Sequence, residues 1–327
     1  MKRLFIFIIS VFLSTQIFAL SPEDFSFYVQ PSIGFTEGQI GEYLYAKNSD
    51  RVISYLQWQE QPLVNGAIDL GVNLYNFNLE GFVSAVLPVY CGQMTDSDWK
   101  KTDVKTNYGI FENSAGKNIN LTGKISYDFF INNFTLSPVV AVNFRYMSFT
   151  ARNGYGWYGE NKAWNSEEII NQPPKKLSGI DYYRRNIIVL AGLKTQYSIN
   201  NFRFGLELDV SPFAVFYAQD YHRDDNVYAP EDEELRQDYI TLMVQNGFFQ
   251  YYSAVLTAEY ICNNQFSLVA AVKGDISPIL KGQTATNAYR GINFGLFEED
   301  PEFMMINQKS GTDTLELSFS FGVKFNF

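Results

Sequence analysis

The chain has 327 residues, of which 46% are hydrophobic, 17% aromatic and 18% charged, and its formal net charge is −10. So many aromatic residues exclude a disordered chain. Two cysteines are too few for a disulfide scaffold or a cysteine-based zinc domain, and the acidic balance argues against nucleic-acid binding. The length admits two globular domains, but a large β-barrel also reaches this length as a single unit.

The first segment has the features of a secretory signal peptide. Lys2 and Arg3 form a short basic start, and the apolar stretch from Leu4 to Leu13 is too short for a permanent membrane-spanning helix. Ala19 is a small residue suited to a cleavage site, so we predict a signal peptide over residues 1–19, with a membrane anchor as the alternative. No later stretch has about 18 consecutive apolar residues. The rest of the chain is therefore expected to be soluble in the periplasm or to form an outer-membrane barrel.

Apolar and polar residues alternate along most of the remaining chain, most clearly at the C-terminus. Apolar residues occupy every second position from Leu315 to Phe327. This run is long for a soluble strand of about 5–6 residues, but it suits a tilted transmembrane strand, which needs about 9–11. Alternation alone does not distinguish a sheet over a soluble core from a barrel whose apolar face meets lipid.

The spacing of turns favours the barrel. Short asparagine-rich turns at 76–78, 132–133, 200–201 and 263–264 alternate with long polar segments at 36–48, 94–117, 150–183, 218–244 and 282–312. Short turns on one side and long loops on the other are typical of transmembrane barrels. We therefore predict an all-β fold, a ten-stranded antiparallel transmembrane β-barrel with short periplasmic turns and long extracellular loops, formed by residues 20–327 as a single domain. The expected strands are 26–35, 49–75 (bulged around 59–66), 78–93, 118–131, 134–149, 184–199, 202–217, 245–262, 265–281 and 313–327.

Four residues near two strand ends could activate a water molecule. Asp96 and Asp98 follow the third strand and Asp220 and His222 follow the seventh, and both strands end on the loop side. Residues two apart in an extended chain share a face. A carboxylate beside histidine fixes its tautomer, and a second pair of carboxylates can hold and polarise a water. The alternative is a common acidic loop motif with an incidental histidine. No metal site is expected, because the ligand spacing of such sites is absent.

These residues resemble the omptin family, the outer-membrane proteases of Gram-negative bacteria. The resemblance covers nearly all of the chain after the signal peptide. It is carried by Asp96–Trp99 together with Asp220–His222, by Ser148–Gly154 and Asn65–Asp69, and by the terminal Lys324–Phe327. It implies a ten-stranded barrel in the cell outer membrane, with an active-site groove at the rim that faces the extracellular side.

The resemblance also implies the roles of the four residues. His222 would be the general base, Asp220 its orienting partner, and Asp96 and Asp98 the couple that positions the nucleophilic water. The resemblance thus implies an aspartic-type endopeptidase with no covalent intermediate, metal or other cofactor. Because histidine must be neutral to accept a proton, activity is expected to fall below a pH of about 6.5.

Omptins usually cut beside basic residues, using two acidic groups in the substrate pocket. Glu42 is similar to one of these groups, whereas the other aligns with the uncharged Ala218. Arg185 is similar to a residue through which the family binds lipopolysaccharide, with a snorkelling interface residue as the alternative. Three positions that are polar or charged in the family are apolar or aromatic here, which argues against dependence on lipopolysaccharide: Val142, Phe144 and Tyr146.

The sequence therefore predicts an outer-membrane endopeptidase that cleaves protein or peptide substrates near basic residues. It is expected to be a monomer in contact with outer-membrane lipid and to bind no nucleic acid. The alternative is a non-proteolytic surface adhesin or interaction protein on an omptin-like barrel. A small pore is a weaker reading, because bulky side chains in a ten-stranded lumen leave little open channel.

Overall fold

The computed structural model describes residues 25–327 except 47–48, 100–102, 160, 223–238 and 288–307, so the predicted signal peptide lies outside the described residues and stays a prediction. The elements are β1 (Phe25–Tyr45), β2 (Val52–Leu74), β3 (Phe77–Val86), β4 (Tyr90–Asp98), β5 (Asn107–Ala115), β6 (Ile119–Tyr127), β7 (Phe129–Ile131), β8 (Phe134–Tyr158), α2 (Glu167–Ile170), β9 (Lys175–Leu177), β10 (Ile180–Ile199), β11 (Phe202–His222), β12 (Tyr239–Gly247), β13 (Tyr252–Ile261), β14 (Phe266–Asn287) and β15 (Gln308–Asn326).

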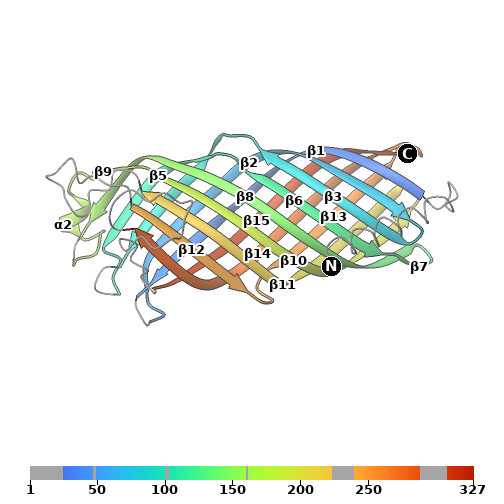
Figure 1. Ribbon diagram of the computed structural model, residues 1–327. Coiled ribbons are helices and arrows are strands. Elements are labelled where there is room, and N and C mark those ends of the chain that lie inside the picture. Colours follow the sequence, from blue (N-terminus) through green and yellow to red (C-terminus); the bar gives the residue numbers. More distant parts are fainter. Residues whose placement is uncertain (1–24, 47–48, 100–102, 160, 223–238, 288–307) are drawn as a thin grey trace.

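The strands form one closed antiparallel sheet. β1 pairs with β2 on one side and with β15 on the other, which closes the ring. The 15 strands of the described residues fill about ten positions around the ring. Some of these positions hold more than one strand segment: β3 with β4, β5 with β6, and β12 with β13 share one position each, the short β7 continues the position of β6, and β9 that of β10. Figure 1 shows a long barrel with α2 and β9 at one end and the C-terminus at the other. The predicted ten-stranded barrel is confirmed.

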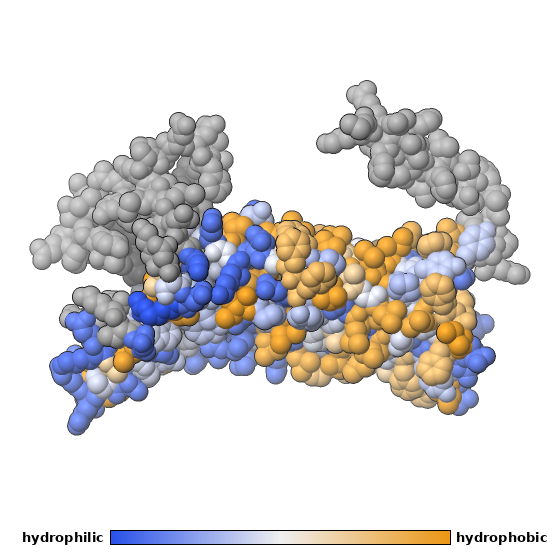
Figure 2. All heavy atoms as spheres, turned by 90° about the horizontal axis from the view of Figure 1, so that it is seen from below, coloured by the Kyte–Doolittle hydropathy of each residue, from blue (hydrophilic) through white to orange (hydrophobic). Residues whose placement is uncertain are grey.

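The apolar face of the alternating strands is on the outside. On β15, Leu315, Leu317 and Phe321 are exposed, whereas Thr314 and Glu316 are buried in the interior. Figure 2 shows the hydrophobic residues gathered in a broad belt that excludes the end carrying α2. In water this surface would be costly, and in lipid it is the required outer wall.

The short turns lie where the asparagines predict them. Asn132 and Asn200 adopt positive φ angles of 54° and 52°, which asparagine tolerates better than most residues. In the fourth turn the Asn263 side chain accepts hydrogen bonds from the backbone N–H groups of Gln265 and Phe266.

The long segments at the other end are not wholly loops, which corrects the sequence analysis. β1 continues to Tyr45, β8 to Tyr158 and β11 to His222. The whole of β5 lies within the predicted loop 94–117. Above the lipid belt the outer face no longer needs apolar residues, so the two-residue apolar pattern ends. The backbone ladder continues, because its hydrogen bonds do not depend on that pattern.

One edge of this upper wall carries small additional elements. β9 pairs with β8 and presents Lys175 and Lys176, both exposed. Within the described ranges, no helix has the length and apolar character that crossing a membrane would require.

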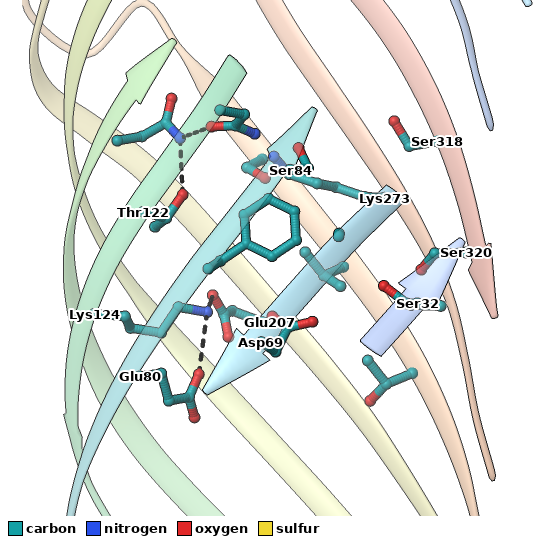
Figure 3. Close-up of a pocket in the computed structure, with 18 of the residues that line it drawn as sticks. Ser32, Asp69, Glu80, Ser84, Thr122, Lys124, Glu207, Lys273, Ser318 and Ser320 are labelled. Carbon is teal, nitrogen blue, oxygen red and sulfur yellow. Dashed lines mark hydrogen bonds and ion pairs between the residues drawn. The ribbon is translucent and has the colours of Figure 1, made fainter. Parts of the chain in front are cut away.

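The lower lumen, toward the end of the barrel with the short turns, holds a polar cavity of about 350 Å³. Figure 3 shows its charged side chains facing one another, with Lys124 paired to Glu80 and Glu207. At the wall of this cavity, Arg145 donates to both carboxylate oxygens of Glu316 and lies 3.4 Å from Glu60. Both carboxylates are almost fully buried. Ion pairs between distant strands thus tie the barrel together across its interior.

Arg145→Met should lower the free energy of unfolding by about 3–5 kcal/mol, because it leaves two buried carboxylates without their cation. The matched control is Lys162→Met, which breaks the exposed pair with Glu168 and should cost less than about 1 kcal/mol. Urea titration of the barrel in lipid vesicles, followed by tryptophan fluorescence, measures both. Equal losses in the two variants would contradict the structural role of Arg145.

Candidate active site

Asp96 and Asp98 lie on the inner wall of the barrel, near the end of β4. The strand is irregular at Gly92, which has a φ of 106°, and the register with β5 shifts there. Beyond it, Met94 is fully buried, and residues at alternate positions share its face. Asp96 and Asp98 therefore point into the lumen. Asp98 accepts a hydrogen bond of 3.2 Å from the Asn107 amide on β5.

Asp220 and His222 form a hydrogen-bonded pair at the end of β11. The His222 Nε2 and Asp220 Oδ2 atoms are 2.9 Å apart. The Asp220 side chain is nearly buried and that of His222 is partly exposed. Both residues still pair with β10, where Tyr182 is opposite Asp220 and Ile180 is opposite His222. The extended backbone is thus what directs both side chains to one face.

An aromatic layer lies between the Asp96–Asp98 pair and the Asp220–His222 pair. Along the ring, β11 and β4 are separated by β10, β8 and β5. Trp58 on β2 is opposite Met94 on β4, and its ring stacks on Tyr182 with centroids 4.9 Å apart. Phe149 on β8 extends the stack. Trp58, Tyr182 and Phe149 are all fully buried, and we call these three residues the aromatic floor.

Glu42 is buried beside this floor. Its carboxylate accepts a hydrogen bond of 3.4 Å from the Trp58 indole N–H. Glu42 pairs with Leu56, which in turn pairs with Asp96, so the two acidic residues belong to one row of the sheet. Along β1, Glu42 comes after Phe35, which is the last exposed large apolar side chain of that strand. Burial, and then the nearby Asp220 carboxylate, raise the pKa of Glu42 to about 8.

Arg184 is a buried residue of the site that the sequence analysis missed. Its guanidinium donates 2.9 Å hydrogen bonds to Asn186 and, across the lumen, to Thr314. It also lies over the Phe216 ring, 4.3 Å from the centroid. Ala218 is its partner on β11. The alternation of the sequence could have identified Arg184. Extending the predicted strand 184–199 back to residue 182 would have placed residues 182, 184 and 186 on one inner face.

Arg185 points the other way. It is exposed on the outer wall, with its guanidinium 5.9 Å from the centroid of the Tyr146 ring on β8. It therefore takes no part in the interior site. Among the residues that the structure describes, no three histidine, cysteine or acidic side chains form a group that could hold a metal ion.

Comparisons with known proteins show the family to which the chain is similar. The model of the omptin family matches residues 22–327. The plasminogen activator of Yersinia pestis is 27% identical over 252 residues, which are 74% of this chain and 72% of that protein. The outer membrane protease IcsP of Shigella flexneri is 24% identical over 256 residues, 75% of this chain and 78% of that protein.

A solved structure shares the fold. The crystal structure of the outer membrane protease OmpT from Escherichia coli superposes with a TM-score of 0.73 at 19% identity, covering 94% of this chain and 99% of that one. The family match spans nearly the whole chain, and the barrel has the matching architecture. The chain therefore belongs to the omptin family of outer-membrane proteases.

Proposed function

We propose that the protein is an endopeptidase in which the Asp220–His222 pair activates the attacking water, with Asp96 and Asp98 positioning it. The observation that carries this proposal is the 2.9 Å contact between Asp220 and His222 on the inner wall. Histidine is the side chain best suited to accept a proton near neutral pH, and here its orientation is fixed by a carboxylate. The site lies at the extracellular end of the barrel.

The reaction would begin with neutral His222 taking a proton from water. Asp220, accepting the Nε2 proton in a hydrogen bond, stabilises the charged imidazolium that results. The hydroxide adds to the peptide carbonyl carbon, and a tetrahedral intermediate forms. As the C–N bond breaks, His222 returns the proton to the leaving amine. Asp96 and Asp98 would hold the water by accepting its hydrogen bonds. These reaction steps would use no metal, cofactor or covalent intermediate.

The substrates would be peptides or exposed protein segments that carry positive charge. Asp96, Asp98 and Asp220 bring three carboxylates to one end of the lumen, and Glu42 adds a fourth only above its pKa of about 8. Such a concentration of one charge draws in oppositely charged ligands. Cleavage near basic residues therefore stays a prediction for this chain.

The outer wall supports two further proposals. Among the described strands, the closed ring leaves no edge that a second copy would have to pair with, so we propose a monomer. Arg185 beside Tyr146 is placed to contact lipid phosphate groups, including those of lipopolysaccharide.

A surface adhesin on the same barrel is the second candidate function. It would use the upper wall to bind a partner without cleavage. The hydrogen-bonded Asp220–His222 pair favours proteolysis, because binding alone gives no reason to combine a buried carboxylate with the sole histidine of the chain.

His222→Ala should reduce kcat/KM for a cationic peptide library by roughly 10²–10⁴-fold, the usual contribution of a general base. The measurement uses the mature chain folded into detergent or lipid vesicles, with and without lipopolysaccharide. The control is Asp50→Asn, which alters an exposed carboxylate paired with Lys281 and Lys309 on the outside. Cleavage that survives in His222→Ala would refute the mechanism, and no cleavage by the wild type would favour the adhesin.

Glu42→Gln should affect cleavage mainly at alkaline pH. Below its raised pKa of about 8, Glu42 is protonated and glutamine replaces it closely. Above that pKa the wild type gains a carboxylate that attracts cations. The ratio of wild-type to variant kcat/KM for an arginine-containing peptide should thus be about one at pH ~6.5 and rise to roughly 3–10 by pH ~9.5. A ratio that stays constant across this range would show that Glu42 does not titrate there.

A further inference from the structure

We infer that Arg184 determines which substrate side chain the site accepts beneath the Asp220–His222 pair: it disfavours lysine and arginine there and favours a side chain with an acceptor oxygen, such as glutamine or glutamate. The inference rests on the proposed endopeptidase function. It names the substrate class of that site and a residue that specifies it.

The first step is the position of Arg184 relative to the reacting groups. Its partner Ala218 precedes Asp220 by two residues on the same inner face of β11. Two residues of a strand span about 6.6 Å. A peptide carbonyl attacked beside His222 would place a long side chain, directed into the barrel, within reach of the Arg184 guanidinium. Ala218 presents only a methyl group at this point.

The second step is an unused donor. Nε and Nη2 of Arg184 donate to Asn186 and Thr314. Nη1 is fully buried, yet it has no hydrogen-bond partner among the described residues. The Tyr182 hydroxyl interacts with both Glu42 and Arg184, but neither its oxygen nor Nη1 of Arg184 makes a hydrogen bond of normal geometry. A buried, charged donor without an acceptor is costly, and a substrate oxygen would satisfy it.

The third step is charge. No described carboxylate lies within ion-pair distance of Arg184, in contrast to Arg145. The neighbouring Glu42 is mostly protonated at neutral pH, and Asp220 is engaged by His222. A substrate cation placed about 5 Å from Arg184, at an effective dielectric constant of about 20, would be disfavoured on the order of 100-fold.

This selection is compatible with substrates that are basic overall. Asp96 and Asp98 are partly exposed at the upper end of the lumen and would attract positively charged segments from solution. Arg184 acts deeper and on a single side chain. The expected substrate thus carries lysine or arginine near the cleaved bond, but not at the position that contacts Arg184.

The test is a peptide library in which each residue flanking the cleaved bond is varied, analysed by mass spectrometry with the mature chain folded in lipid vesicles. The wild type should cleave peptides with glutamine or glutamate at one flanking position at least tenfold better than those with lysine or arginine there. Arg184→Gln should raise the relative kcat/KM for the basic peptides at least tenfold.

Two further variants keep the test decisive. Arg203→Gln is the matched control, since it removes an arginine paired with Glu259 in the lower lumen, and it should leave the preference unchanged. If Arg184→Gln does not fold, Ala218→Asp serves instead. It places a carboxylate opposite Arg184 and should likewise shift preference toward lysine and arginine.

The outcomes separate the two proposals. A wild type that cleaves through His222 but accepts lysine and arginine equally well at both flanking positions would overturn the role of Arg184 and leave the proposed function standing. An unchanged preference in both Arg184→Gln and Ala218→Asp would do the same. A wild type that cleaves no peptide, or whose cleavage persists in His222→Ala, would refute the endopeptidase function and, with it, this inference.

Discussion

Lipid provides no hydrogen-bond partners, so every backbone N–H and C=O group within the membrane must be paired inside the protein. The closure of β1 onto β15 meets this requirement, and the remaining features depend on it. The ladder that satisfies the backbone in lipid continues above the lipid belt, into the region of β4 and the end of β11. The candidate catalytic side chains are therefore positioned by strand register, which is more rigid than a loop.

The same constraint explains what could be predicted from sequence. In lipid, an apolar outer face and a polar inner face alternate, so β15 and the turns at Asn132 and Asn200 were recognisable. The two-residue spacing of Asp220 and His222 predicted their pairing for the same reason. Above the belt the outer face meets water, while the inner face carries apolar side chains such as Phe111 and Ala115 of β5 as well as polar ones. The alternation that marks a lipid-facing strand is lost there, and the sequence analysis assigns β5 to a loop.

Arg184 shows the other limit of sequence reasoning. Asn186 and Phe216 lie on β10 itself and on its neighbour β11, but Thr314 comes from β15, which faces β10 across the lumen only because the ring closes. Arg145 is buried against the carboxylate of Glu316, whereas the recorded hydrogen-bond partners of Arg184 are uncharged. Two inward arginines in similar strands thus have different physical roles, and this difference depends on residues more than a hundred positions away in the sequence.

The exposed lysines of β9 bear on whether one copy of the protein could cleave another. Lys175 and Lys176 stand at the rim of the same molecule, where a neighbouring copy in a crowded membrane could reach them. A protease that demanded a basic residue in its deepest position would be at risk of cutting its own kind there. The preference proposed for Arg184 would exclude these lysines from that position, and β9 is held in the sheet by β8. A neighbouring copy would then be a poor substrate, although foreign cationic chains would still be attracted.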